Sequence, residues 1–244
     1  MKKKPVKLSI KSLFLVFFIL VILLISNMIK EGVDANANTE NIQEINTTTN
    51  TIDKFTVCID AGHGGYDVGA VTSSNISEKD ITLKIALKVG ALLEKEGVNV
   101  LYTRTSDKVS WPSNNKLDIR ARVKVSNEAK ADAFVSIHCN SSINSSDHGV
   151  ETWCRFPNSD GEKLAESLQK ELISSNYSTD RGLKYESNGS LGVLRLNNSV
   201  SALIELGFLS NSSDIKFITS ESGQDVCANS IAKGILNYKS YVNK

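Results

Sequence analysis

The chain lacks the short signatures of several common enzyme classes. It has no GxSxG, which excludes the nucleophile elbow of serine hydrolases, and no GxxxxGK[ST], which excludes a nucleotide-binding P-loop. It has no HExxH either, so any metal ligands must come from separate parts of the chain. Basic residues are scarce after the N-terminus. Six of the 28 lysines and arginines and no acidic residue precede residue 31, which leaves 22 basic against 27 acidic side chains and a net charge of about −5 over residues 31–244. That balance argues against nucleic-acid binding.

Cysteine is also sparse, with four residues, and none of them lies in a CxxC pair. An even number permits disulfides outside the cell, with three alternative pairings. However, Cys58 and Cys139 lie within or beside apolar runs typical of strands, where cysteine is usually a small buried hydrophobe. We expect Cys58, Cys139, Cys154 and Cys227 all to be structural, and their pairing stays open.

One long uncharged run, SLFLVFFILVILLISNMI, covers residues 12–29. As a helix it would be about 27 Å long, close to the thickness of a bilayer core. Lysines before it favour a cytoplasmic N-terminus and an extracytoplasmic remainder. ANA at 35–37 is an alternative cleavage site for a secreted form, but we favour an uncleaved membrane anchor. The polar stretch 34–53 predicts a flexible spacer, so the predicted organisation is an anchor over 1–30, a linker over 31–53 and a catalytic domain over 54–244.

After the spacer, short apolar runs alternate with helical patterns. We predict strands over 55–60, 98–104, 133–138, 149–154, 191–195 and 201–206, and helices over 78–96, 117–131, 160–175 and 222–242. Alternation of this kind predicts a single α/β domain, with a central, mostly parallel or mixed β-sheet flanked by helices.

Polar side chains stand at or just after the ends of three predicted strands: His63, His138 and Glu205. The carboxyl ends of parallel strands meet at one edge of a sheet, so we expect these residues to lie together. Imidazole nitrogens bind Zn²⁺, and a catalytic zinc takes three protein ligands. Glu78 is the best placed third ligand, because it begins a helix fifteen residues after His63, with Ser77 as the expected cap.

Each of these residues has a simpler alternative role. A lone histidine at a strand end is more often a hydrogen-bonded structural residue than a ligand, and Glu78 could merely favour the helix dipole. Glu205 interrupts an apolar strand, where an ionised carboxylate is costly without a partner. It is therefore a salt-bridged glutamate, a glutamate on an edge strand, or a general base for metal-assisted amide hydrolysis. His148 lies in a polar loop and is expected to be solvated.

Four ordered motifs carry a resemblance: IDAGHGGYDVGA, Glu78 at a helix start, ADAFVSIHCNSS and ALIELGFLSN. With these motifs in this order, the chain resembles the zinc-dependent N-acetylmuramoyl-L-alanine amidases over about residues 55–241. The resemblance implies one Zn²⁺ held by His63, Glu78 and His138, with Glu205 as the catalytic glutamate. The implied substrate is bacterial peptidoglycan, cut between N-acetylmuramic acid and L-alanine. The resemblance also places two further residues, Asn140 and Arg195, in the substrate groove.

The chain departs from the family in one place, since Ser201 stands where proline is usual before the glutamate strand. It has no autoinhibitory helix between the Glu78 and His138 motifs. Its compact, tethered form resembles members that process spore cortex, although a role in the vegetative wall stays open, as does the need for an activating protein partner. Two alternatives also stay open: a metallopeptidase that cuts within the stem peptide, and a non-catalytic wall-binding domain.

Overall fold

The computed structural model describes residues 54–186 and 190–243. The predicted anchor, residues 12–29, and the predicted spacer, 34–53, lie outside these ranges. Within the described part of the chain, no helix combines the length and apolar character needed to cross a bilayer.

Six strands form one central sheet in the order β2-β1-β3-β6-β4-β5. The strands are β1 (Thr56–Ala61), β2 (Asn99–Tyr102), β3 (Ala133–Asn140), β4 (Val150–Cys154), β5 (Asp180–Tyr185) and β6 (Val200–Phe208). Neighbouring strands are parallel except β4 and β6, which are antiparallel. The predicted mixed sheet is therefore confirmed. The inner strands β1, β3 and β6 are buried along almost their whole length, as expected for strands covered on both faces.

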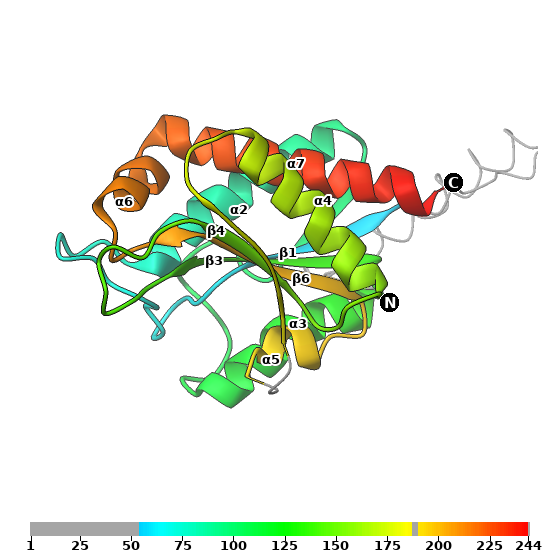
Figure 1. Cartoon of the computed structure of the whole chain (residues 1–244). Helices are drawn as coiled ribbons and strands as arrows, with labels where there is room; N and C mark the ends of the chain where they lie inside the picture. Colours follow the sequence, from blue (N-terminus) through cyan, green and yellow to red (C-terminus); the bar gives the residue numbers. More distant parts are fainter. Residues whose placement is uncertain (1–53, 187–189, 244) are drawn as a thin grey trace, which may run out of the picture. The chain divides into compact units, whose positions relative to one another are not determined.

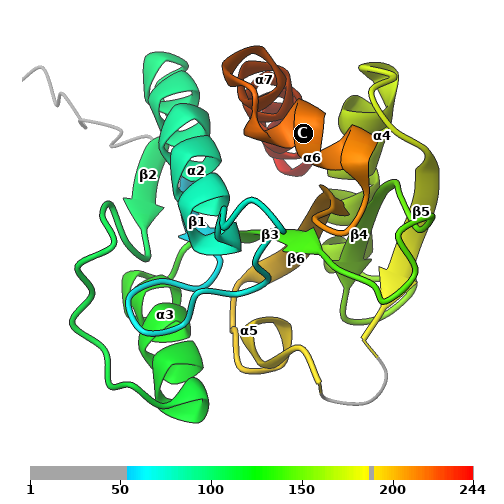
Figure 2. The same cartoon turned by 90° about the vertical axis from the view of Figure 1, so that its left-hand side faces the viewer.

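Helices cover both faces of the sheet (Figures 1 and 2). One face carries α2 (Glu78–Lys95), α4 (Asp160–Ser174), α6 (Ser212–Thr219) and α7 (Glu221–Val242), and the other carries α3 (Asn115–Ala129) and α5 (Gly192–Arg195). Ile59 and Ile204 belong to the larger hydrophobic cluster, under α2, α4 and α7, whereas Phe134 and Leu203 point into a smaller cluster with α3 and α5. Because helices cover both faces of the sheet, a functional site is expected at the carboxyl ends of the strands.

Three local predictions need correction. The apolar run 191–195 is mostly the short helix α5, not a strand, because Val193 and Leu194 pack beside α3 and five residues are too few to show a period. β5 and α6 were not predicted. Ser77 occupies the N-cap of α2 but its side chain makes no capping hydrogen bond, whereas Asn114 and Ser159 do cap α3 and α4. All four cysteines are buried and unpaired.

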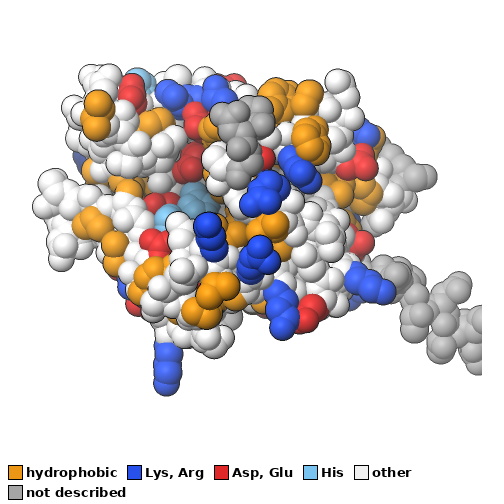
Figure 3. All heavy atoms as spheres, turned by 90° about the horizontal axis from the view of Figure 1, so that it is seen from below, with side chains coloured by type: hydrophobic (Ala, Val, Ile, Leu, Met, Phe, Trp, Pro, Cys, Tyr) orange, Lys and Arg blue, Asp and Glu red, His pale blue; other side chains and the backbone are white. Residues whose placement is uncertain are grey.

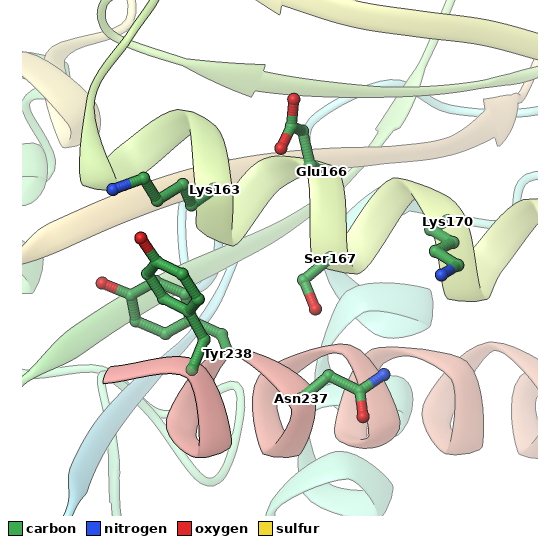
Figure 4. A pocket seen from close by; sticks show the side chains of 7 residues that line it. Lys163, Glu166, Ser167, Lys170, Asn237 and Tyr238 are labelled. Atoms are coloured by element: carbon green, nitrogen blue, oxygen red, sulfur yellow. The ribbon is translucent and has the colours of Figure 1, made fainter. Parts of the chain in front are cut away.

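On the face of the sheet that carries α2, helices α4 and α7 lie against each other (Figure 4). A pocket of about 280 Å³ lies where α4 and α7 meet. Its walls include Lys163, whose ammonium lies 5.0 Å from the ring centroid of Tyr241, and Ser167, whose hydroxyl donates to the carbonyl of Gly234 at 2.8 Å. A Cβ at Gly234 would lie 2.9 Å from Cα of Leu168, so glycine is what lets the two backbones approach.

A buried ion pair ties α3 to β1 beneath the sheet. Asp60 accepts two hydrogen bonds from Arg122, at 2.9 and 2.5 Å, and one each from Ser136 and Thr103, at 2.6 and 2.8 Å. Burial alone would raise the pKa of the Asp60 carboxyl, but Arg122 and these hydrogen bonds outweigh it and hold that pKa well below its usual range. Asp60 stands three residues before His63, so the pair also anchors the start of the loop that carries the histidine.

Candidate metal centre

The glycine-rich turn after β1 brings His63 into close contact with two other elements. His63 itself has φ 61°, a left-handed conformation uncommon outside glycine. A Cβ at Gly62 would lie 2.5 Å from Cε1 of His138, and one at Gly69 would lie 2.5 Å from a carboxylate oxygen of Glu78. The glycines are therefore needed because side chains from β3 and α2 occupy the space that any larger residue would fill.

The carboxylate of Glu78 lies between two imidazoles. One oxygen is 3.1 Å from Nε2 of His63, and the other is 3.0 Å from Nδ1 of His138. The backbone N–H groups of Ala70 and Cys139 also donate to it, at 3.0 and 2.9 Å. The side chain is only 4% exposed. The end of β3, the loop after β1 and the start of α2 thus bring His138, His63 and Glu78 into contact. The sequence predicted that these residues lie together.

These residues fit a zinc ion. Within the described part of the chain, His63, Glu78 and His138 each offer a donor atom, and all three atoms lie within 4.8 Å of one another. Two imidazoles and a carboxylate form a ligand set that catalytic zinc sites use. Burial alone would raise the pKa of Glu78, but hydrogen bonds and charge from the two histidines hold it well below the usual range. The carboxylate is therefore ionised, as a metal ligand must be.

Asp67 supports His63 from the side away from Glu78. Its Oδ2 lies 2.8 Å from Nδ1 of His63, and its Oδ1 accepts from the backbone N–H of Gly69 at 3.1 Å. A carboxylate on one imidazole nitrogen fixes the tautomer and leaves the other nitrogen for a metal. Sequence reasoning missed this residue, although it lies in the same glycine-rich motif, four positions after His63.

Glu205 stands on β6 between His138 of β3 and Glu151 of β4, and it is in register with both. Register partners on adjacent strands project to the same face, so Glu205 lies on the same face of the sheet as His138. Its Oε2 is buried and has no hydrogen-bond partner among the described residues. Burial first, and then the charges of Glu78 and Glu151, raise the pKa of Glu205 well above its usual range. A carboxyl with such a pKa suits proton transfer near neutral pH.

Glu151 is a second buried acid that the sequence did not reveal. It is held by Arg181, whose Nε donates at 2.7 Å, and by the side-chain nitrogens of Asn140 and Trp153, each at 3.1 Å. The pattern GVETWC is typical of a strand whose glutamate faces solvent. Only the pairing of β4 with β6 places Glu151 beside Glu205. Asn140, which the resemblance placed in the substrate groove, turns its amide toward Glu151.

Two other sequence candidates lie apart from this cluster. Arg195 ends α5 and is exposed, and it lines a separate cavity between α3 and α5. His148 is exposed in the loop before β4, with Nδ1 2.8 Å from the carbonyl oxygen of Ser146, and it is not part of the three-residue group. The structure therefore agrees with leaving His148 out.

Comparison with known proteins assigns the chain to a family. The N-acetylmuramoyl-L-alanine amidase family matches residues 57–237, and the chain belongs to that family. The resemblance drawn from the four motifs is thereby confirmed, and the chain is an enzyme of the amidase class. It is 36% identical over 191 residues to the germination-specific N-acetylmuramoyl-L-alanine amidase of Bacillus subtilis (strain 168), over 75% of this chain and 78% of that protein.

Solved structures agree with the family assignment. The catalytic domain of CwlV, an N-acetylmuramoyl-L-alanine amidase from Bacillus (Paenibacillus) polymyxa var. colistinus, superposes with a TM-score of 0.68 at 36% identity and covers 76% of this chain and 98% of that one. The CwlD amidase of Clostridioides difficile, solved in complex with the GerS lipoprotein, gives a TM-score of 0.71 at 34% identity, over 77% of this chain and 100% of that one. Both likenesses cover nearly the whole of the domain described above.

Proposed function

We propose that the chain hydrolyses the amide between N-acetylmuramic acid and L-alanine in bacterial peptidoglycan, with one Zn²⁺ held by His63, Glu78 and His138. One observation carries the proposal. The ionised Glu78 carboxylate lies within 3.1 Å of a nitrogen of each histidine, while Glu205 stands in register with His138 on the next strand.

The side chains have separate roles in this reaction. A zinc ion in the site would supply a Lewis acid that polarises the amide carbonyl and acidifies water. Glu205 accepts the proton of the attacking water at its carboxylate and returns it to the leaving nitrogen of alanine. Asp67 keeps His63 oriented, and Glu151 keeps a negative charge beside Glu205. Asn140 and Arg195 remain our candidates for the walls of the substrate groove.

The site of action that we propose is extracytoplasmic. Residues 12–29 would anchor the enzyme in the membrane, or it would be secreted after cleavage. Likeness to a germination-specific amidase supports the finer proposal that the substrate is spore cortex. The CwlD structure with its GerS lipoprotein supports an activating protein partner. Loss of the encoding gene should then change stem-peptide content in the cortex, and an unchanged cortex would point to the vegetative wall.

The direct test uses the purified chain with and without added Zn²⁺, incubated with purified peptidoglycan, and mass spectrometry of the soluble products. We expect free stem peptides with an unmodified N-terminal L-alanine, released only when metal is present. Shortened stems still joined to sugar would make the enzyme a metallopeptidase. Glu205→Gln serves as the matched control, because it should bind zinc without releasing product. If no product forms even with metal bound and candidate partners added, the wall-binding alternative is favoured.

A further inference from the structure

A second cavity, of about 480 Å³, lies between α3 and α5. We call it the α3–α5 pocket. Three of its lining residues are basic, Lys116, Arg120 and Arg195, and its floor includes Ile119 and Gly192. A Cβ at Gly192 would lie 3.0 Å from Cγ2 of Ile119, so the two helices are in contact there.

The basic side chains converge because of where they stand on the helices. Lys116 and Arg120 are one turn apart on α3 and share a face, and Arg195 is the last residue of α5. On the face that α3 and α5 form, Lys and Arg side chains gather beside a hollow in which histidine is visible (Figure 3). The face that α3 and α5 form thus presents a local positive surface beside that hollow.

The three charges of the pocket have no acidic partner. None of them forms an ion pair with a carboxylate anywhere in residues 54–186 and 190–243, whereas Arg122 and Lys124, on the same helix α3, each do. All three are exposed, so solvent screens them in part. Like charges around one cavity repel each other, and an anion bound there would relieve that repulsion.

One hydrogen bond joins helix α3 to the loop that carries His63. The hydroxyl of Tyr66 donates to Oδ2 of Asp118 at 2.5 Å. Asp118 lies on α3 between Lys116 and Arg120, and Tyr66 follows His63 by three residues. The helix that supplies two of the basic residues of the pocket therefore contacts the loop that carries His63.

We propose that the α3–α5 pocket binds the free α-carboxylate of the acidic second residue of the stem peptide, and so selects stems in which that group is not amidated. The inference rests on the proposed function, which places the muramoyl–alanine bond at the metal centre. Arg120 and Arg195 suit this ligand, because a guanidinium can bind a carboxylate through two parallel hydrogen bonds. Lys116 adds a third positive charge at the rim.

Binding and turnover can be measured separately on the whole chain. Calorimetry compares two released stem peptides that differ only in whether the second α-carboxyl is free or amidated. Kinetics compares the two corresponding muropeptides. We expect the wild-type chain to bind the free acid about tenfold more tightly than the amide, and Arg120→Gln and Arg195→Gln each to remove that preference. Lys124→Gln, on the same helix but paired with Glu128 outside the pocket, should keep it.

Each outcome bears on a distinct claim. Selective binding of the acid stem by a chain that cuts no muropeptide, even with zinc bound and candidate partners added, would support the pocket and refute the proposed function. Equal binding and equal cleavage of both peptides would leave the function intact and overturn the pocket proposal. If the arginine variants instead lose affinity for inorganic phosphate and phosphate-bearing wall polymer, without any change in acid–amide selectivity, the pocket serves wall phosphates and our assignment is wrong.

Discussion

Glu151 and Glu205 stand directly opposite each other in the antiparallel pairing of β4 with β6. Glu151 is 3% exposed and is paired with Arg181, whereas one oxygen of Glu205 is buried without a partner. Two carboxylates so placed oppose each other's ionisation. Burial first, and then the charges of Glu78 and Glu151, raise the pKa of Glu205 well above its usual range.

Replacing Glu151 with glutamine should shift the pH profile of the enzyme. The negative charge of Glu151 raises the pKa of Glu205, so removing it lowers that pKa. A general base works when deprotonated, and the acidic limb of kcat/KM should therefore move to lower pH. The pH dependence of muropeptide cleavage measures this shift, with Glu128→Gln on the exposed surface of α3 as control. An unmoved acidic limb would show that Glu151 does not influence the base.

Substitutions at the metal centre should separate binding from turnover. Glu205→Gln should retain zinc and lower kcat by about 10²- to 10⁴-fold, the usual contribution of a general base. His138→Ala should lose both metal and activity, because it removes one of three ligands. Metal analysis of the purified proteins, beside product release, distinguishes the two. Full activity of Glu205→Gln would remove the proposed mechanism even though the fold and family stand.

Asp67→Ala should weaken zinc binding without abolishing it. Carboxylates that orient a ligating histidine typically change metal affinity by about 10- to 100-fold. Competition with a chelator of known affinity gives the measurement. Asp107→Ala is the matched control, since Asp107 accepts from the backbone of Gly65 in the same loop but does not touch His63. Equal losses in the two variants would mean that the loop, not the histidine, had been disturbed.

Asp60→Asn should destabilise the fold, because it leaves Arg122 buried without its counter-charge. Breaking a buried pair in this way costs about 3–5 kcal/mol. The pKa of Asp60 is lowered by folding, so its contribution is complete above the unfolded value near 4 and is lost as pH falls below it. Denaturant unfolding at neutral and acidic pH should thus show the difference between wild type and variant shrinking in acid. Asp225→Asn, in the exposed pair with Lys88, should cost far less, because solvent screens that pair.

The framework of the fold was predictable because buried parallel strands are continuous apolar runs. FTVCID, AFVSIH and SALIEL each mark an inner strand, and their shared edge brings the two histidines and Glu205 together. The family resemblance, rather than spacing, made the assignment of Glu78 specific. These features depend on local patterns and on one rule of sheet geometry.

Other features depend on which elements pack together and could not be read from local patterns. LGVLR became a helix because it packs beside α3, and β5 was missed because its residues are largely polar or partly exposed at the sheet edge. Ser77 has the right position for a cap but makes no capping bond. The role of Glu151 emerges only from the order β6-β4, which places it opposite Glu205.

The proposed catalytic base, Glu205, and the proposed zinc ligand His63 lie on supports of different rigidity. Glu205 belongs to a strand held on both sides, by β3 and by β4, and a one-residue slip would turn it to the opposite face. His63 instead sits in a loop whose conformation relies on glycines and on a left-handed backbone. Removing zinc should therefore loosen the loop while the sheet and the base keep their places. The apoenzyme should accept metal again without refolding, so that metal supply could switch a standing pool of enzyme on and off.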